Sequence, residues 1–347
     1  MKDDAILIDF GLHYKQMLHA SYFWDQYKLK TIITDKKKND LEDGNFNEII
    51  AVRNNFLMLK MIIFCFFNAF NSKKVIVLTG PEYGSYYKYL IIRFLWFIFC
   101  LMFRQKIIIY VKNTSAYSKC KFLKKTCVLV DRCLFESELQ RDSFLSKIKI
   151  NKNKTGVVYV YYPDVFAKTT VENKSLTSKI TVGLIGQFDI NRRDYSELLS
   201  LLDENLLAED YEFIQIGRFI PSDQATKIKN KYYGRLRFIK DDFSSKEIDE
   251  YISSCDVLLS MNKKASEYAH GKGTAAFGEA IAARKPLIVP SFLNIYTEFK
   301  DVCKFYNDDK TLIDALKESA KLNLVNQAYR KYESKNVMLN LSNEYCI

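Results

Sequence analysis

Basic side chains and glycines occur together in three loops in the second half of the chain. The loops contain the sequences GQFDINRRD, GRF and HGKGT. Glycine permits tight turns, and backbone N–H groups at a helix start favour an anion. The anion-binding candidates are Gly186, Gln187, Arg192, Arg193, Gly217, Arg218, Lys272, Gly273 and Thr274. Arg192 and Arg193 could clamp a diphosphate, and a solvated helix start is the alternative interpretation of this pair.

Each of these loops follows an apolar segment that predicts a short buried strand. The second half contains five segments of this kind, which are 179–186, 211–217, 235–240, 256–260 and 286–291. Ser244 precedes Glu247 by three residues, which is the spacing of a capping box at a helix start. Strands that alternate with helices predict a doubly wound parallel sheet, and such sheets bind ligands at the carboxyl ends of their strands.

The first half of the chain shows the same alternation of strands and helices. Its predicted strands are AILID (5–9), TIIT (31–34), KVIVLTG (74–80), KIIIYV (106–111), CVLVD (127–131) and GVVYVYYP (156–163). We therefore expect an α/β fold with two doubly wound domains. The expected organisation is an N-terminal domain over 1–163, a linker over 164–178, a second domain over 179–335, and a tail over 336–347 that packs on the N-terminal domain.

The second half resembles the donor-binding domain of GT-B glycosyltransferases, especially the retaining family 4. The resemblance covers roughly residues 179–335 and rests on VGLIGQF, RRDYSELL, RFIKDDFSSKEIDEYISSCDVLLS and GTAAFGEAIAARKPLIVPS. It implies two Rossmann-like domains that face each other across a cleft. It also implies that the glycine loop and the arginine pair hold the diphosphate of a nucleotide sugar. By the same resemblance, Glu279 binds the ribose hydroxyls, and Ile239 and Lys240 flank the nucleobase.

One position departs from the family pattern. Many family members carry a second Glu eight residues before the ribose Glu, and this chain has Gly271 there. The departure leaves the donor sugar and the stereochemical outcome open.

The implied chemistry is glycosyl transfer from a nucleotide-diphosphate sugar. The anomeric C–O bond breaks through an oxocarbenium-like transition state while negative charge grows on the diphosphate, so fixed positive charge should contribute most. Arg193 and Lys272 are the catalytic candidates for this role. The sequence has no Asp-x-Asp motif and three His. We therefore expect a metal-independent reaction without a separate cofactor, in which the sugar nucleotide is a substrate.

The first half would bind the acceptor, and its candidate residues follow predicted strands. Gly11 and His13 come just after the first strand, and Glu82 follows the strand at 74–80. His13 could be an acceptor-side base, a donor contact or a structural histidine. Glu82 could accept a proton from a sugar hydroxyl or cap the next helix. The segment KNTSAY, residues 112–117, could line the same region.

The positive charge of the chain is concentrated in its first half. Residues 1–163 contain 26 Lys and Arg against 14 Asp and Glu, whereas residues 164–347 contain 26 against 27. The first half also holds two apolar segments, 56–70 and 89–103, each too short for a transmembrane helix. They could be core helices or helices that dip into a bilayer. Basic charge beside apolar helices favours peripheral contact with an anionic membrane.

Cysteine usage and the first residues bear on the cellular location. The eight Cys are scattered without CxxC spacing, which is typical of reduced thiols. The start MKDDAILIDFG lacks the pattern of a signal peptide. We expect a cytoplasmic protein that attaches peripherally to the inner face of the cell membrane.

The main hypothesis is a retaining glycosyltransferase that extends a lipid-linked or oligosaccharide acceptor in surface polysaccharide synthesis, of the O-antigen or capsule type. One alternative is a sugar-nucleotide epimerase with the same fold. Others are an inactive transferase-like scaffold and a non-catalytic basic module that binds membrane or nucleic acid. Nucleic acid is not an expected partner, because the basic residues form no stripe with stacking aromatic residues.

Overall fold

The computed structural model describes residues 4–9, 14–34, 38, 41–52, 59–60, 63, 74–79, 106–159, 161–169, 179–207, 210–240, 243–264, 268, 274–321 and 327–345. The chain divides into two compact units. Unit 1 comprises Met1–Val160, Gly271–Gly273 and Ser334–Ile347, and unit 2 comprises Tyr161–His270 and Thr274–Glu333.

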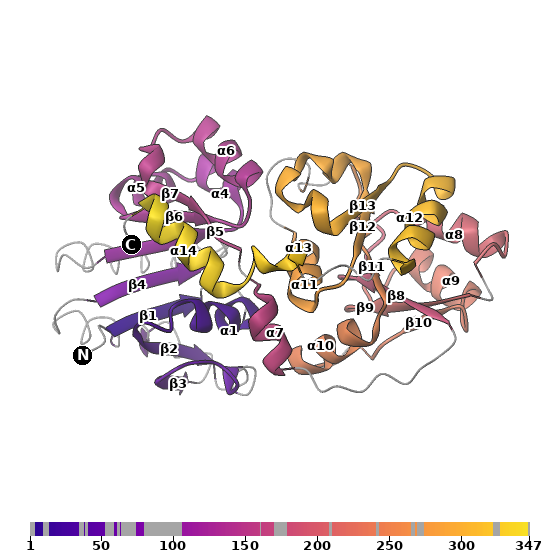
Figure 1. Ribbon diagram of the computed structural model, residues 1–347, viewed down its shortest axis with the longest axis horizontal. Helices are drawn as coiled ribbons and strands as arrows, with labels where there is room; N and C mark the ends of the chain where they lie inside the picture. Colours follow the sequence, from indigo (N-terminus) through magenta and orange to yellow (C-terminus); the bar gives the residue numbers. More distant parts are fainter. Residues whose placement is uncertain are drawn as a thin grey trace. The chain divides into compact units, whose positions relative to one another are not determined.

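Unit 1 is built on a parallel sheet with the strand order β3-β2-β1-β4-β5-β6-β7 (Figure 1). The strands are β1 (Asp4–Asp9), β2 (Lys28–Thr34), β3 (Glu48–Val52), β4 (Lys74–Thr79), β5 (Lys106–Val111), β6 (Arg132–Phe135) and β7 (Thr155–Val157). The chain winds outward from β1 in one direction and from β4 in the other. This reversal between β1 and β4 is the switch point of a doubly wound sheet.

The described helices of unit 1 flank this sheet. They are α1 (Tyr14–Phe23), α4 (Thr114–Lys119), α5 (Lys121–Leu129), α6 (Glu138–Lys147), the short 3₁₀ helix η4 (Lys152–Lys154) and α14 (Ser334–Tyr345). Helix α14, which contains most of the expected tail, contacts α1. Isoleucines of β1 and β5 form the core of unit 1 together with residues of α5 and α6.

One predicted strand of unit 1 is wrong, and another is too long. Of the predicted strand 156–163, only residues 156 and 157 belong to a strand, β7, and Pro163 begins helix α7 (Pro163–Thr169). The segment CVLVD, residues 127–131, was expected to be a strand, but Lys121–Leu129 is helix α5 and the strand β6 begins at Arg132. Cys127 and Val130 are buried, whereas Val128 and Leu129 are exposed. A short apolar run fits a helix or a strand equally well, and only the alternation of burial over the longer segment distinguishes them.

Unit 2 contains a second parallel sheet, with the order β10-β9-β8-β11-β12-β13. The strands are β8 (Ile180–Ile185), β9 (Tyr211–Ile216), β10 (Leu236–Phe238), β11 (Val257–Leu259), β12 (Leu287–Pro290) and β13 (Cys303–Tyr306). Counted from the first strand of each sheet, the winding pattern is the same as in unit 1. The prediction of two doubly wound parallel sheets is confirmed.

Helices and 3₁₀ turns connect the strands of unit 2. They are α7 (Pro163–Thr169), α8 (Ser196–Asp203), α9 (Asp223–Lys231), α10 (Ser245–Ser254), α11 (Ala275–Ala283), η6 (Ser291–Ile295), η7 (Thr297–Val302), α12 (Asp309–Lys321) and α13 (Gln327–Arg330). Residues 164–169 of the expected linker belong to helix α7, which packs on α10 and α11. The predicted capping box is present, because Ser244 and Glu247 bond each other's backbone N–H at the start of α10.

The apolar segments 56–70 and 89–103 lie outside the described residues, apart from three positions in the first of them. Two of these three, Leu59 and Ile63, are 57% and 44% exposed. Among the helices that the structure describes, none has the length and hydropathy needed to cross a bilayer.

Candidate functional site

The switch point of unit 2 lies between β8 and β11, and two glycines shape the loops beside it. Gly186 directly follows β8 and has a φ of 101°, and Gly217 directly follows β9 and has a φ of 146°. A Cβ at Gly217 would overlap the carbonyl oxygen of Gly186, and a Cβ at Gly186 would overlap the guanidinium of Arg193. Both positions therefore require glycine, because only glycine combines this backbone conformation with so close an approach.

Arg193 joins the loops after β8 and β11. Its Nη1 donates to Ser260 Oγ at 3.1 Å and to Asn262 Oδ1 at 2.7 Å. The neighbouring Asp194 N–H donates to the carbonyl oxygen of Met261 at 2.9 Å, so the backbones are bonded as well. Arg193 is 9% exposed, and burial lowers the pKa of its guanidinium from the ordinary value. Both side-chain partners are neutral oxygens, so they do not cancel the charge of Arg193.

Asn262 adds a second buried donor to this site. Its Oδ1 accepts hydrogen bonds from Arg193 and, at 2.6 Å, from Ser260 Oγ, which fixes the orientation of the amide. Within the described residues, the buried Nδ2 of Asn262 has no acceptor. A buried donor without an acceptor is costly, and a bound anion would satisfy it. The guanidinium and the amide N–H together therefore suit an anionic ligand.

Arg192 is exposed and has a different environment from Arg193. Its guanidinium donates to the Tyr268 hydroxyl and, at 3.4 Å, to Gln187 Oε1. The guanidinium carbons of Arg192 and Arg193 lie 5.8 and 5.9 Å from the centre of the Tyr268 ring. Both arginines precede α8, which begins at Ser196, and neither belongs to the helix. Arg192 is therefore held at the surface by Tyr268, whereas Arg193 is held in the interior by Ser260 and Asn262.

The loop after β9 packs beside the loop after β8. Phe188 N–H donates to the carbonyl oxygen of Arg218 at 2.9 Å, and the Phe188 ring stacks on that of Phe219. The Arg218 side chain is exposed. The structure thus brings together Gly186, Gln187, Arg192, Arg193, Gly217 and Arg218, as the order of the strands predicts.

The positions assigned to the nucleobase follow β10. Ile239 is 9% exposed, and Lys240 forms an exposed ion pair with Glu247 at 2.9 Å. Lys240 therefore interacts with the capping box of α10, and an exposed pair of this kind holds its geometry weakly.

Helix α11 carries two more candidates. Thr274 caps its N-terminus by accepting from Ala276 N–H at 3.4 Å, and Glu279 lies partly buried in its middle turn. Gly278 lies against the ring of Tyr161, so α11 approaches its neighbour closely at this point. Gly11, His13, Glu82, Gly271, Lys272 and Gly273 lie outside the described residues.

The sequence reasoning missed Ser260, Asn262 and Tyr268. Ser260 and Asn262 stand at the carboxyl end of β11, where polar residues are expected to face a ligand, so the rule used for the glycine loops could have found them. Nothing in the sequence indicates that they bind Arg193, because the partners are 67 and 69 residues apart.

Unit 1 also holds charged groups at the carboxyl end of its sheet. Lys112 follows β5 and is 4% exposed, and Glu136 follows β6. Gln16 Nε2 donates to Glu136 Oε1 at 3.1 Å, and Gln140 Nε2 donates to the carbonyl oxygen of Lys112 at 2.7 Å. Burial raises the pKa of Glu136, and the charge of Lys112 and the Gln16 hydrogen bond oppose that rise. The sequence reasoning missed Glu136 because it placed the end of this strand at Asp131.

Among the residues that the structure describes, no group of three or more His, Cys, Asp or Glu could hold a metal ion.

No protein-family model and no curated protein sequence matches the chain. Solved structures match over nearly the whole length. The UDP-GlcNAc 2-epimerase from Neisseria meningitidis, bound to UDP-GlcNAc, is 12% identical and has a TM-score of 0.60, with 99% of each chain covered. A glycosyltransferase from Rickettsia africae is 13% identical with a TM-score of 0.60, covering 99% of this chain and 95% of the other. A trehalose-6-phosphate synthase is 11% identical with a TM-score of 0.56, with 99% of each chain covered.

These likenesses show the fold. The chain has the GT-B architecture of two Rossmann-like α/β domains, which agrees with the winding of its two sheets.

Proposed function

We propose that the chain binds a nucleotide-diphosphate sugar at the switch point of unit 2 and transfers the sugar to a lipid-linked or oligosaccharide acceptor. The observation that carries the proposal is the buried Arg193, bonded to neutral oxygens beside the unsatisfied Nδ2 of Asn262. A buried cation next to a spare donor is costly in the empty protein, and a diphosphate offsets that cost. The resemblance to family 4 supports the interpretation of the chain as a transferase. It also supports retention of configuration at the anomeric carbon.

Arg193 acts on the leaving group in this proposal. Negative charge grows on the diphosphate as the anomeric bond breaks, and a guanidinium that is already held in place needs no reorganisation to stabilise it. Arg192, which is exposed beside the same loop, adds a second cation. Lys272 and the backbone of residues 273–274 remain candidates for the same task, and Glu279 remains the candidate ribose ligand.

Glu136 is the acceptor-side candidate that the described part of unit 1 offers, beside the earlier candidates His13 and Glu82. A general base works best when its pKa lies near the working pH, and burial shifts the pKa of Glu136 in that direction. Its role would be to accept the proton of the attacking sugar hydroxyl. The setting that we propose is the assembly of a surface polysaccharide.

A sugar-nucleotide epimerase is the second candidate, because several of the matching structures are UDP-GlcNAc 2-epimerases. The two reactions can be distinguished by a solvent-exchange experiment. Epimerisation at C2 breaks the C2–H bond, so deuterium from D₂O enters the sugar without any acceptor. Glycosyl transfer leaves the C2–H bond intact and requires an acceptor. Deuterium incorporation into a nucleotide sugar, followed by NMR, would therefore establish the epimerase.

Asn262→Asp tests the binding site itself. The aspartate keeps the hydrogen bonds to Arg193 and Ser260, but it neutralises the guanidinium and places negative charge where the diphosphate should bind. Calorimetry with UDP-, GDP- and ADP-sugars should show a donor for the wild type and at least about a hundredfold weaker binding for the variant. Arg237→Asn, at an exposed arginine of β10 that pairs with Glu212, is the control and should bind like the wild type. Unchanged affinity in Asn262→Asp would refute the site.

A further inference from the structure

The exposed face of α5 combines lysines with large apolar side chains. Lys121, Lys124, Lys125, Val128 and Leu129 follow one another at intervals of three and one, so they share one side of the helix. All five are exposed, and Val128 and Leu129 expose 48% and 52% of their surface. Apolar side chains at the end of a row of lysines form an amphipathic surface. Contact with water accounts for the lysines but not for the exposed apolar side chains.

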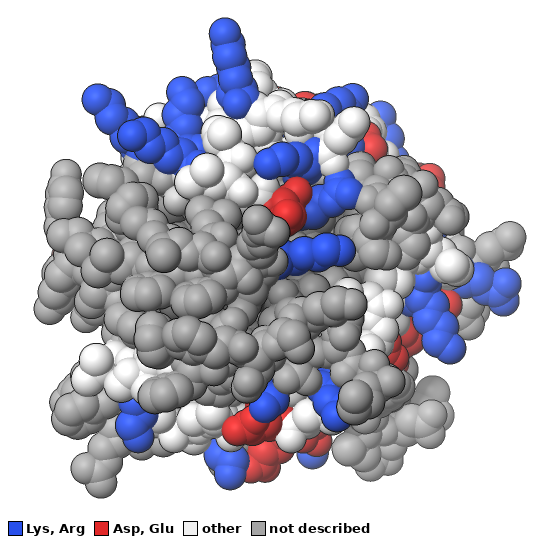
Figure 2. Space-filling model, turned by 90° about the vertical axis from the view of Figure 1, so that its left-hand side faces the viewer, with Lys and Arg blue, Asp and Glu red and all other residues white. Residues whose placement is uncertain are grey.

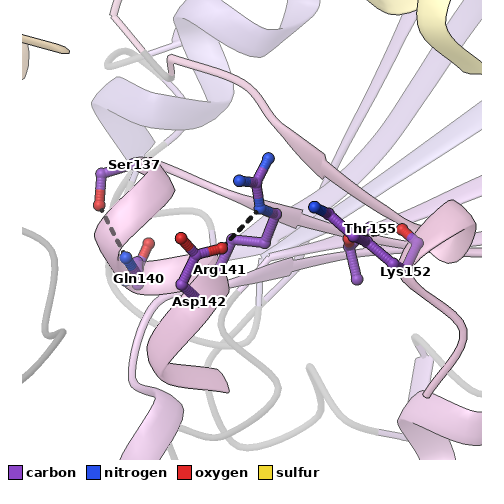
Figure 3. Close-up of polar contacts among 6 residues, drawn as sticks. All are labelled: Ser137, Gln140, Arg141, Asp142, Lys152 and Thr155. Carbon is purple, nitrogen blue, oxygen red and sulfur yellow. Dashed lines mark hydrogen bonds and ion pairs between the residues drawn. The ribbon is translucent and has the colours of Figure 1, made fainter. Parts of the chain in front are cut away.

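The helix η4 extends this surface. Lys154 Nζ donates to the carbonyl oxygens of Val128 and Val130, at 3.1 Å each, and so joins η4 to the end of α5. Lys152 is exposed on η4, and its carbonyl oxygen accepts a 2.7 Å hydrogen bond from Thr155 Oγ1 (Figure 3). The α5 face is defined here as Lys121, Lys124, Lys125, Val128, Leu129, Lys152 and Lys154.

Acidic residues do little to cancel the charge of this region. Residues 106–157 contain 12 Lys and Arg against 4 Asp and Glu. Asp131 accepts from Ile107 N–H at 2.7 Å, and Asp142 pairs with Arg141 at 3.1 Å (Figure 3). Figure 2 views the molecule from the left-hand side of Figure 1. It shows basic side chains gathered along the upper edge, where Figure 1 places α5 and α6.

The end of the α5 face that carries Val128, Leu129, Lys152 and Lys154 lies at the amino ends of β6 and β7. The end of α5 leads into β6, and η4 leads into β7. The charged groups at the carboxyl end, Lys112 and Glu136, are at the opposite edge of the same sheet. Ligands of doubly wound sheets bind at the carboxyl edge, so neither the donor nor the reacting end of the acceptor accounts for this surface.

We propose that the α5 face docks the protein on an anionic lipid bilayer. The lysines would contact the headgroups while Val128 and Leu129 enter the boundary between headgroups and acyl chains. A nucleic acid would use the lysines but not the apolar pair, because its affinity comes chiefly from phosphate contacts. The inference builds on the proposed function, since a lipid-linked acceptor requires the enzyme at a membrane, but it can be tested without donor or acceptor.

Co-sedimentation of the full chain with lipid vesicles tests the proposal. The wild type should sediment with phosphatidylcholine vesicles that contain phosphatidylglycerol, and not with pure phosphatidylcholine vesicles. Lys124→Glu with Lys125→Glu should lower the partition coefficient at least about tenfold, because each basic residue near an anionic surface contributes strongly. Val128→Ser with Leu129→Ser should lower it about tenfold through loss of apolar contact.

Matched controls come from exposed positions of unit 2. Lys227→Glu with Lys317→Glu repeats the charge change on α9 and α12. Leu206→Ser with Ile295→Ser repeats the apolar change at residues that are 56% and 42% exposed. Both control pairs should sediment like the wild type.

Three outcomes would overturn the proposal. In the first, the wild type does not sediment with the anionic vesicles. In the second, the two α5 variants sediment with them as the wild type does. Finally, an RNA oligonucleotide could bind through the same lysines while the Val128 and Leu129 changes have no effect on vesicle binding, which would assign the face to a nucleic acid. Calorimetry with the nucleotide sugar on the same proteins reports on unit 2 alone, so a failure of membrane docking and a failure of the donor site are told apart.

Discussion

Each parallel sheet has a desolvated charged side chain at its carboxyl edge, but the two charges differ in sign and in surroundings. In unit 2 the cation Arg193 donates its hydrogen bonds to neutral oxygens, and the charge of Asp189 acts on it more weakly than burial does. In unit 1 the carboxylate Glu136 lies beside the cation Lys112. Burial lowers the pKa of Arg193 and raises the pKa of Glu136, and both shifts favour the neutral form of the group. Keeping either group charged therefore lowers the stability of the fold. Charges that a fold retains at a cost are candidates for function, and the sign indicates the task. The cation suits an anionic leaving group, and the carboxylate suits a proton.

The largest expected effect concerns the close packing that places the cation in unit 2. Gly217→Ala should lower the free energy of unfolding by more than about 3 kcal/mol, because the new Cβ overlaps the Gly186 backbone and the positive φ is strained. Gly234→Ala is the control: its φ is 90° but it has no neighbour within 4 Å of the added Cβ. This control should cost about 1 kcal/mol, from the backbone alone. Urea unfolding of the two variants measures the difference, and equal losses would show that the loops are not tightly packed.

A change at Asn262 makes unit 2 resemble unit 1 by giving its cation a carboxylate partner. Asn262→Asp should raise the free energy of unfolding by about 1 kcal/mol at neutral pH, because the aspartate compensates the buried Arg193 and removes the unsatisfied Nδ2. The same change weakens donor binding at least about a hundredfold in our proposal. If Asn262→Asp were less stable than the wild type and still bound the donor, the proposed difference between the carboxyl edges of the two sheets would be wrong.

Glu136→Gln removes the charge that unit 1 retains. A carboxyl group with a raised pKa binds its proton more readily in the folded chain, so wild-type stability should fall as the pH rises from the ordinary pKa of Glu through the raised one. The variant should lack this slope and should be more stable above that window, by about 1 kcal/mol. Denaturation at a series of pH values measures both effects. Glu138→Gln, at the exposed start of α6, should leave the slope in place.

The last effect, at His19, has the opposite dependence on pH. His19 is 1% exposed, and burial, reinforced by Lys15, lowers its pKa well below the ordinary value. The unfolded chain therefore binds a proton that the folded chain does not, and stability falls as the pH drops below about 6.5. His19→Gln should reduce this loss by roughly 1 kcal/mol one unit below that pH, after allowance for any change in stability at pH 8. If His19→Gln lost as much stability at low pH as the wild type does, His19 would be protonated in the folded protein.

The sequence predicted the edge of unit 2 better than that of unit 1. Gly186, Gly217 and the arginine pair follow unambiguous strands, so their convergence could be derived from strand order. The different environments of Arg192 and Arg193 could not be derived, because Ser260 and Asn262 are distant in sequence. In unit 1, the apolar run at 127–131 fits a helix or a strand, and the wrong choice moved the expected strand end away from Glu136.

The position of the α5 face has a consequence for the size of the acceptor. The strand β6, which leads from the end of α5 to Glu136, has four residues and spans about 13 Å, so Glu136 would stand roughly that far above a bilayer that touches the amino end of this strand. The length of the strand then sets the distance between the bilayer and Glu136. A lipid bearing its first sugar would fall short of Glu136, whereas a glycan that has already grown outward could reach it. An enzyme with this geometry would elongate existing chains and leave the priming of the lipid to another enzyme.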